Sequence, residues 1–343
     1  MKNINIDLRS DTITIPTQGM LDYMFNAKVG DDVWEEDETV KQLENDLAHL
    51  FSKESALFCP SGTMTNQIAI RVHTKMGDEL ICDRLSHIYN YEGGGIASNS
   101  GVSVKLIEGD YGRMSLSQIK NNINSDDVHL SRTRLVCLEN TVNKGGGVCY
   151  DYQDMKAISN YCKAHDLMLH LDGARIFNAL IAKADASHEY GQLFDSISIC
   201  LSKGLGAPVG SVLIGDSSFI KEAKRVRKSF GGGMRQVGYL AAAGQYALEH
   251  NVNRLSEDHV RARIIGDKLT KMDYVENLRP VETNIVLFDI KVSQYSLLTF
   301  RDLLETHHIK ASFMGNNTVR FVTHLHFCDT QLEILLNVLQ KLN

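Results

Sequence analysis

Short apolar runs alternate with amphipathic stretches through the first 250 residues of the chain. The apolar runs have the length of buried strands and lie at 56–59, 79–82, 102–107, 135–138, 167–171, 196–201 and 211–214. The stretches at 38–51, 63–76 and 154–165 have the spacing of helices with one apolar face. Short apolar strands separated by helices are typical of a mostly parallel sheet covered by helices on both faces. The sequence therefore predicts an α/β fold.

The pattern changes after an alanine-rich helix predicted over 237–250. The next elements are a long charged helix over 255–272, strands at 284–288 and 318–322, and helices near 296–306 and 330–342. No linker rich in Pro, Ser or Gly separates the two regions, so we expect them to pack closely. We predict a large domain over residues 1–250, beginning with an extended arm over 1–15, and a small α+β domain over residues 251–343.

Composition limits the classes of function. The chain has 343 residues, and its formal net charge of -6 provides no basic face for nucleic acid. Seven cysteines without a C-x-x-C pair fit free thiols in a reducing compartment better than disulfides or a zinc site. The N-terminus lacks an apolar signal core, and no apolar run approaches the ~18 residues of a spanning helix. We expect a cytoplasmic protein with a small-molecule substrate and no metal, nucleic-acid or membrane partner.

One lysine lies in a turn of small residues, Ser202-Lys203-Gly204-Leu205-Gly206, between the last two apolar runs of the large domain. Lysine is rarely buried without a partner or a function. One interpretation is a side chain that turns to solvent. The other is a desolvated amine that forms a Schiff base with a carbonyl compound. The turn alone does not decide between them. Lys144 is the weaker candidate, because the glycines that follow it indicate a solvated turn.

Two groups of polar residues follow predicted strands. Ser61, Gly62 and Thr63 lie between a strand and a helix, where hydroxyls and free N–H groups either cap the helix or bind a phosphate. Asp172 ends the strand at 167–171, at the edge where α/β folds bind ligands. Its buried carboxylate needs a partner, which is either Arg175 or the cationic ring nitrogen of a ligand.

Three further groups allow both a structural and a functional interpretation. His87 and Tyr91 precede three glycines, so the histidine is either structural or stacked on a flat cofactor. Lys228 and Arg235 flank three glycines, in a flexible basic loop or at a phosphate. Arg320 lies inside a strand, where it faces solvent or binds a carboxylate. Together, these groups are the ones that pyridoxal phosphate requires to act on an amino acid.

Seven motifs across the chain resemble those of the low-specificity L-threonine aldolases, which have the aspartate-aminotransferase-like (type I) fold of pyridoxal-phosphate enzymes. The motifs are 7–12, 30–33, 60–63, 170–175, 201–204, 231–236 and 320–324. The resemblance implies a lyase that cleaves L-threonine, L-allo-threonine and related β-hydroxy-α-amino acids to glycine and an aldehyde, which is acetaldehyde for threonine. It also implies a cytoplasmic homotetramer with sites at dimer interfaces and a part in glycine biosynthesis.

The resemblance also implies a role for each site residue. Lys203 forms the Schiff base with the cofactor, Asp172 pairs with the pyridinium nitrogen, and His87 stacks over the ring. The other cofactor contacts are Ser61, Gly62, Thr63 and Arg175, with Lys228 and Arg235 reaching the phosphate of a neighbouring subunit. The substrate contacts are Ser10, Tyr91, His129, Arg175 and Arg320. The base that takes the hydroxyl proton is His87, His129 or a water.

The chain departs from the family pattern at three places. Trp34 and Glu35 stand where a tyrosine and a glycine are usual, Val142 stands where a histidine is common, and His326 stands where an acidic residue is frequent. None of these changes removes an implied catalytic group. The first two bear on side-chain preference or on the fit between subunits.

Other functions stay open beside this one. Alanine racemisation and β-elimination are alternative reactions on the same scaffold. A non-catalytic cofactor-binding protein is disfavoured by the joint presence of Lys203, Asp172 and Arg320. A nicotinamide-binding fold is disfavoured because G-x-G-x-x-G does not follow the first strand. The sequence does not indicate the preferred substrate or the stereochemistry at Cβ.

Overall fold

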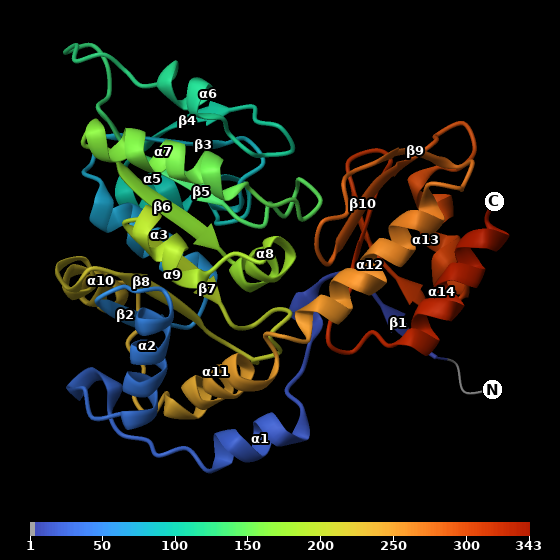
Figure 1. Cartoon of the computed structure of the whole chain (residues 1–343), viewed down its shortest axis with the longest axis horizontal. Coiled ribbons are helices and arrows are strands. Elements are labelled where there is room, and N and C mark those ends of the chain that lie inside the picture. Colours follow the sequence, from blue (N-terminus) through green and yellow to red (C-terminus); the bar gives the residue numbers. More distant parts are fainter. Residues whose placement is uncertain (1–3) are drawn as a thin grey trace.

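The computed structural model describes residues 4–343 and has two parts of unequal size (Figure 1). Within these residues the strands form a seven-stranded, a four-stranded and a two-stranded sheet. The seven-stranded sheet lies in the larger part and has the order β2-β8-β7-β6-β5-β3-β4. Its strands are β2 (Ser55–Cys59), β3 (Glu79–Asp83), β4 (Ser103–Ile107), β5 (Thr133–Glu139), β6 (Met168–Gly173), β7 (Ser196–Cys200) and β8 (Ser211–Gly215). Each apolar run predicted for the large domain forms one of these strands.

Neighbouring strands of the large sheet are parallel except at β8. That strand runs antiparallel to both β2 and β7, whereas β3, β4, β5, β6 and β7 pair in parallel. The carboxyl ends of β2 and of these five strands therefore meet at one edge of the sheet. This arrangement confirms the predicted α/β fold with a mostly parallel sheet.

Helices cover both faces of the large sheet (Figure 1). In β2, Leu57 and Cys59 pack with α3 and α10, whereas Ala56 and Phe58 join the larger core on the opposite face. The helices of this part are α1 (Gln18–Phe25), α2 (Glu38–Leu50), α3 (Gly62–His73), α4 (His87–Asn90), α5 (Gly95–Ser100), α6 (Leu116–Lys120), α7 (Tyr152–Ala164), α8 (Ile176–Lys183), α9 (Ser187–Leu193), α10 (Ser217–Ser229) and α11 (Gly238–His250). The spacing did not predict α8, which is mostly apolar and therefore lacks a contrasting polar face.

The smaller part contains the four-stranded antiparallel sheet, in the order β12-β13-β10-β9. Its strands are β9 (Val275–Leu278), β10 (Ile285–Ile290), β12 (Ser312–Met314) and β13 (Thr318–Val322), and its helices are α12 (Leu255–Leu269), α13 (Leu297–Thr306) and α14 (Asp329–Lys341). Within residues 4–343, no helix has both the length and the apolar character needed to cross a membrane.

The beginning of the N-terminal arm lies in the smaller part. There β1 (Ile6–Asp7) pairs in parallel with β11 (Ile309–Lys310), and Ile6 and Leu8 are fully buried in the core of that part. The chain then crosses to the larger part, where α1 packs on α11 (Figure 1). The predicted boundary near residue 250 falls between α11 and α12. The N-terminal arm contacts both the larger and the smaller part. The division into residues 1–250 and 251–343 stays a prediction.

Candidate active site

A cavity of about 140 Å³ opens at the carboxyl edge of the large sheet. It contains the residues that follow β2, β3, β6 and β7, which parallel strands bring together at this edge. The lining residues are Ser61, Gly62, Thr63, Asn66, His87, Asp172, Ala174, Cys200, Ser202 and Lys203. The sequence predicted seven of these ten positions to be functional or to flank the lysine, and the fold brings them to one place.

The first wall of the cavity is the N-terminus of α3. Ser61 is the N-cap of this helix, and its Oγ accepts a hydrogen bond from the backbone N–H of Met64 at 3.2 Å. Ser61 therefore caps the helix and also lines the cavity, so the two interpretations of this residue are compatible. Free N–H groups and the positive end of the helix dipole favour an anion here. A Cβ at Gly62 would lie 2.5 Å from Sγ of Cys200, so any larger residue would narrow the cavity.

Asp172 also lines the cavity and is 2% exposed. Its Oδ2 accepts a hydrogen bond from Nδ2 of Asn66 at 2.9 Å, and its Oδ1 accepts one from the backbone N–H of Ala174 at 3.1 Å. Arg175 instead forms an ion pair with Asp11. The interpretation of Asp172 as a structural partner of Arg175 is therefore wrong, and its carboxylate faces the cavity with neutral donors around it.

His87 begins α4, directly after the turn that follows β3. Its Nδ1 lies 3.0 Å from Oε1 of Glu92, and its backbone N–H donates to Oε2 of Glu139 at 2.6 Å. Burial lowers the pKa of His87, but the hydrogen bond to Glu92 and the nearby carboxylates outweigh this effect, so the pKa lies above its usual value. The ring of Tyr91 lies 5.5 Å away by ring centroids.

A second cavity, of about 400 Å³, adjoins the first and shares His87 and Lys203 with it. Its lining residues are Ser10, Thr12, His87, Tyr91, Asn143, Arg175, Lys203, Ser312, Phe313, Met314 and Arg320. Four of the predicted substrate contacts, Ser10, Tyr91, Arg175 and Arg320, are thus beside the predicted Schiff-base lysine. The segment Ser312–Met314 of the smaller part closes this cavity, which therefore lies between the two parts of the molecule.

Arg320 lines the second cavity and makes two side-chain hydrogen bonds. Its Nη1 donates to Oδ1 of Asn143 at 2.8 Å and its Nη2 to the carbonyl of Arg9 at 3.0 Å. Its Nε is buried and has no hydrogen-bond partner within the described part of the chain. Burial and the positive charge of Arg175 lower the pKa of Arg320. A carboxylate bound in the second cavity would supply the missing partner and offset the repulsion.

Arg175 is held by a buried carboxylate. Its Nε and Nη2 donate to the two oxygens of Asp11 at 2.8 and 2.7 Å. Asp11 is completely buried and also accepts a hydrogen bond from Asn284 at 3.2 Å. These two parallel hydrogen bonds fix the orientation of the Arg175 guanidinium relative to the Asp11 carboxylate.

Lys203 lies in the turn 201–210 between β7 and β8, as predicted, and lines both cavities. Its carbonyl accepts hydrogen bonds from the hydroxyl of Thr14 at 2.8 Å and from the backbone N–H of Gly206 at 2.9 Å. The turn is thus anchored by the N-terminal arm. Lys203 is half-buried and lines both cavities, which favours a functional role over a side chain that only turns to solvent.

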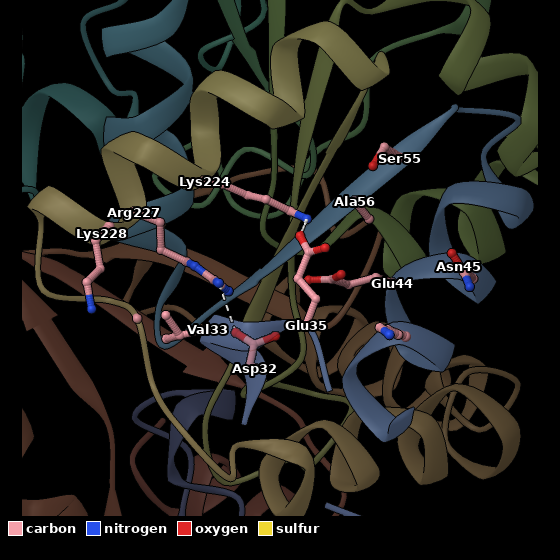
Figure 2. Close-up of a pocket in the computed structure, with 12 residues that line it drawn as sticks. Asp32, Val33, Glu35, Glu44, Asn45, Ser55, Ala56, Lys224, Arg227 and Lys228 are labelled. Carbon is pink, nitrogen blue, oxygen red and sulfur yellow. Dashed lines mark hydrogen bonds and ion pairs between the residues drawn. The ribbon is translucent and has the colours of Figure 1, made fainter. Parts of the chain in front are cut away.

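Three predicted site residues lie outside these cavities. Lys228 lines a separate cavity of about 400 Å³, drawn in Figure 2, in which Lys224 pairs with Glu35 and Arg227 with Asp32. Arg235 pairs with Asp31 at 2.8 Å. His129 is in an exposed loop, where its side chain is 86% exposed and pairs with Asp127. A single chain therefore does not bring these three residues to the candidate site.

The departures from the family pattern have different surroundings. Trp34 is 74% exposed. Glu35 has a φ of 58°, in the left-handed region that favours glycine, and its carboxylate pairs with Lys224 at 2.6 Å. Val142 is 1% exposed and packs in the main core. Its backbone N–H donates to the carbonyl of Val148 at 3.0 Å.

The chain is similar to proteins of one family over nearly its whole length. The sequence model of the family described as "Beta-eliminating lyase" matches residues 7–293. Low-specificity L-threonine aldolase 1 of Arabidopsis thaliana is 40% identical over 343 residues, which cover 98% of this chain and 96% of the relative. The chain belongs to the low-specificity L-threonine aldolases of this family. The low specificity L-threonine aldolase of Escherichia coli (strain K12) is 40% identical over 328 residues, which cover 95% of this chain and 96% of the relative.

A solved structure has the same fold as this chain. The threonine aldolase of Leishmania major covers 98% of this chain and 99% of its own, with a TM-score of 0.86 and 21% identity. The chain therefore has the type I fold of pyridoxal-phosphate enzymes, as the motifs predict.

Members of the low-specificity L-threonine aldolase family depend on pyridoxal phosphate, and the residues at the first cavity fit that cofactor. The N-terminus of α3 offers N–H groups and hydroxyls to a phosphate, and Asp172 offers a carboxylate to a protonated ring nitrogen. Lys203 offers a primary amine in the same cavity. The absence of a side chain at Gly62 keeps the phosphate end open.

Sequence reasoning missed a set of polar residues around this site: Asp11, Asn66, Glu92 and Glu139, which are buried, and Asn143, which is half-buried. Each hydrogen-bonds a predicted site residue or its backbone. A weak signal existed for two of them, since Asn66 follows Thr63 by one helical turn and Glu92 is adjacent to Tyr91. Burial and the nearby charge of Asp172 raise the pKa of Glu139 to about 7.

Proposed function

We propose that the protein is a pyridoxal-phosphate-dependent L-threonine aldolase of low specificity. It cleaves L-threonine, L-allo-threonine and related β-hydroxy-α-amino acids to glycine and an aldehyde, which is acetaldehyde for threonine. The observation that carries this proposal is the pair of adjoining cavities, which share Lys203 and His87. One cavity contains Asp172 and the N-terminus of α3, and the other contains Arg320 with an unpaired Nε.

In the first cavity, the chain's residues hold and orient the cofactor. Lys203 supplies the amine for the Schiff base, and Asp172 keeps the ring nitrogen protonated. Ser61, Gly62 and Thr63 would hold the phosphate, and His87, which lines the same cavity, would contact the ring. The bound cofactor supplies an electron sink for the charge left on Cα when the Cα–Cβ bond breaks.

In the second cavity, the chain binds the substrate carboxylate. Arg320 is the principal contact, which its buried Nε supports. Ser10 adds a hydroxyl, and Arg175 adds positive charge from a guanidinium already fixed by Asp11. Holding the carboxylate at this end orients the Cα–Cβ bond toward His87 and Tyr91.

A base takes the proton of the β-hydroxyl as the Cα–Cβ bond breaks, so that the hydroxyl carbon becomes the aldehyde. A proton returned to Cα gives glycine, and the reaction needs no oxidant. We propose His87 as the group that holds this proton, because it lines both cavities and is bonded to Glu92. His129 can act here only from a neighbouring subunit, since its own chain leaves it exposed.

We further propose that the protein works as a cytoplasmic homotetramer with sites at dimer interfaces and contributes to glycine biosynthesis. Lys228 and Arg235 support an assembly, because both lie outside the two cavities that contain Lys203 and carry charge suited to a neighbour's phosphate. The seven cysteines, all within the described part of the chain, are free, which supports a reducing compartment.

The test begins with an absorbance spectrum of the purified protein and continues with aldehyde detection after addition of L-threonine. The protein is expected to absorb visible light and to release acetaldehyde and glycine in equal amounts. Pyruvate and ammonia from serine would instead identify β-elimination, and D-alanine from L-alanine would identify racemisation. Either product in place of acetaldehyde would refute the proposal.

Two variants assign the roles in the first cavity. Lys203→Ala is expected to lose the visible absorbance of the Schiff base and nearly all turnover, because no other amine lines that cavity within residues 4–343. Asp172→Ala is expected to bind the cofactor but to lose most of the rate, because the ring nitrogen is then no longer held protonated. Wild-type turnover in either variant would contradict the assignment.

A further inference from the structure

Glu92 connects His87 to Asp172 through a buried hydrogen-bond network. Its side chain is 0% exposed and lies in the loop between α4 and α5. Oε1 of Glu92 accepts from Nδ2 of Asn66 at 2.9 Å and lies 3.0 Å from Nδ1 of His87. Oε2 accepts from Nε2 of Gln67 at 2.7 Å. A carboxylate only accepts hydrogen bonds, so Nδ1 of His87 carries a proton and Nε2 is the nitrogen left for the cavity.

Asn66 joins the two carboxylates. Its Nδ2 donates to Oε1 of Glu92 and to Oδ2 of Asp172, both at 2.9 Å. An amide nitrogen has two N–H groups, and each carboxylate uses one of them. The opposite orientation of the amide would place its oxygen against two carboxylate oxygens. The orientation is therefore fixed, and Oδ1 of Asn66 faces Nε2 of His170 at 3.1 Å.

The hydrogen-bond network continues from Asn66 to His170, Ser196 and His73. Burial lowers the pKa of His170 to about 4 and that of His73 to about 3, so both rings are neutral at pH 7. Because Asn66 accepts from Nε2–H of His170, Nδ1 of His170 accepts from Ser196, whose Oγ lies 2.8 Å away. The same Oγ lies 2.8 Å from Nε2 of His73, which donates to it. Each of these hydrogen bonds therefore has one donor and one acceptor, and the network holds Asn66 rigidly.

We propose that Glu92 is a positioning residue for the reaction: it fixes the tautomer and the ring orientation of His87, and through Asn66 it holds the carboxylate of Asp172. The proposal rests on the proposed function for the role of His87. The part that concerns cofactor binding depends only on the geometry of the first cavity. Glu92 itself does not line either cavity.

The charges around His87 predict the direction in which its pKa changes when Glu92 is replaced. Three carboxylates face this histidine, from Glu92, from Asp172 of β6 and from Glu139 of β5, and Lys203 lines the same cavity. Glu92 is the carboxylate that hydrogen-bonds the ring, and removal of its charge takes away one of the three attractions for the imidazolium. The pKa of His87 is therefore expected to fall, by about one unit for the loss of one adjacent charge.

Glu92→Gln is the informative variant, because the side chain keeps its shape. Its amide oxygen can still accept from His87 and Asn66, and Gln67 can turn its own oxygen toward the new amide nitrogen. Glu79→Gln is the matched control. Glu79 is a buried carboxylate that accepts side-chain hydrogen bonds from Asn124 and Thr133, but it begins β3 at the far edge of the sheet.

The holoenzymes of both variants are compared with the wild type in three measurements. The melting temperature reports folding, cofactor titration followed by visible absorbance reports the dissociation constant, and threonine cleavage is measured from pH 5.5 to 9. Glu92→Gln is expected to lower kcat roughly 10- to 100-fold with little change in KM, since a small displacement of a reacting group has this effect. The acidic limb of the kcat profile should move down by about one unit. The cofactor should also bind more weakly.

Glu79→Gln is expected to change only the melting temperature. The proposal is overturned if Glu92→Gln matches Glu79→Gln in kcat, in the pH profile and in cofactor affinity, because Glu92 would then be structural only. If the wild type does not cleave threonine, the proposed function fails, but the cofactor titration still tests Glu92. Unchanged cofactor affinity in that case would overturn the proposal as well.

Discussion

The buried ion pair of Asp11 and Arg175 predicts a large loss of stability on substitution of one partner. Asp11 is completely buried, and its two oxygens accept from Nε and Nη2 of Arg175. Asn284 of the smaller part donates to the same carboxylate at 3.2 Å. Asp11→Asn keeps the shape but removes the charge, which leaves the guanidinium buried without a counter-ion. The pair links the arm, the larger part and the smaller part, so its loss acts on all three.

Removal of one partner of a buried ion pair costs about 3–5 kcal/mol, because the remaining charge stays desolvated. Unfolding entropy is about 2.1 cal/mol/K per residue near 60 °C. For 343 residues that unfold as one unit, this amounts to about 0.7 kcal/mol/K, so the expected fall in melting temperature is about 4–7 °C. Asp7→Asn is the control, because Asp7 pairs with Arg9, whose side chain is 51% exposed. A pair of this kind contributes about 0–1 kcal/mol.

The assay is thermal unfolding of both variants, with urea unfolding as a second measure. Burial would raise the pKa of Asp11, but Arg175, Lys203 and Asn284 outweigh it and hold the pKa well below its usual range. The contribution of the pair is therefore present above pH ~4 and is lost as the pH falls further. Asp11→Leu combined with Arg175→Met should recover much of the stability. The reasoning is refuted if Asp11→Asn melts no lower than Asp7→Asn at pH 7.

Two further predictions concern Glu44 and Gly62, both in the larger part of the molecule. Burial raises the pKa of Glu44 from 4.5 to about 7. Between these two pH values the folded protein holds a proton that the unfolded chain has released. Wild-type stability therefore falls as the pH rises from 4.5 through 7. The melting temperature of Glu44→Gln relative to the wild type should therefore increase over that range, and a constant difference would contradict the raised pKa. Gly62→Ala should weaken cofactor binding and cost about 1–3 kcal/mol, because the new Cβ meets Sγ of Cys200. Adding Cys200→Ala should restore part of both losses, and absence of any rescue would place the defect elsewhere.

The sequence predicted the large sheet well because its strands are buried on both faces. A strand such as β2 is then apolar and buried from Ala56 to Cys59 and stands out from amphipathic helices. The residues after β2, β6 and β7 were also predictable, because parallel strands bring their carboxyl ends together. By contrast, β1 has two residues and pairs with a strand near the other end of the chain, so no local pattern identifies it.

The polar network behind the site was not predictable in the same way. Glu92 and Asn66 are residue types that are usually exposed, and their positions near Tyr91 and Thr63 are only a weak signal of a role at the site. Their roles depend on three segments that meet only in the folded chain: α3, the loop after α4 and the end of β6. The positions of Lys228, Arg235 and His129 relative to a neighbour's site depend on an assembly, which the resemblance implies and a single chain does not contain.

The pairing of β1 with β11 has a consequence for how the protein is made. Ile6 and Leu8 are made about 300 residues before the strand that covers them, Ile309–Lys310. At a synthesis rate of 5–20 residues per second, the arm waits for about 15–60 s with two apolar side chains uncovered. Thr14 of the same arm hydrogen-bonds the carbonyl of Lys203. The segment that anchors the turn of Lys203 is therefore also the segment whose beginning is covered only after residues 309–310 have been made.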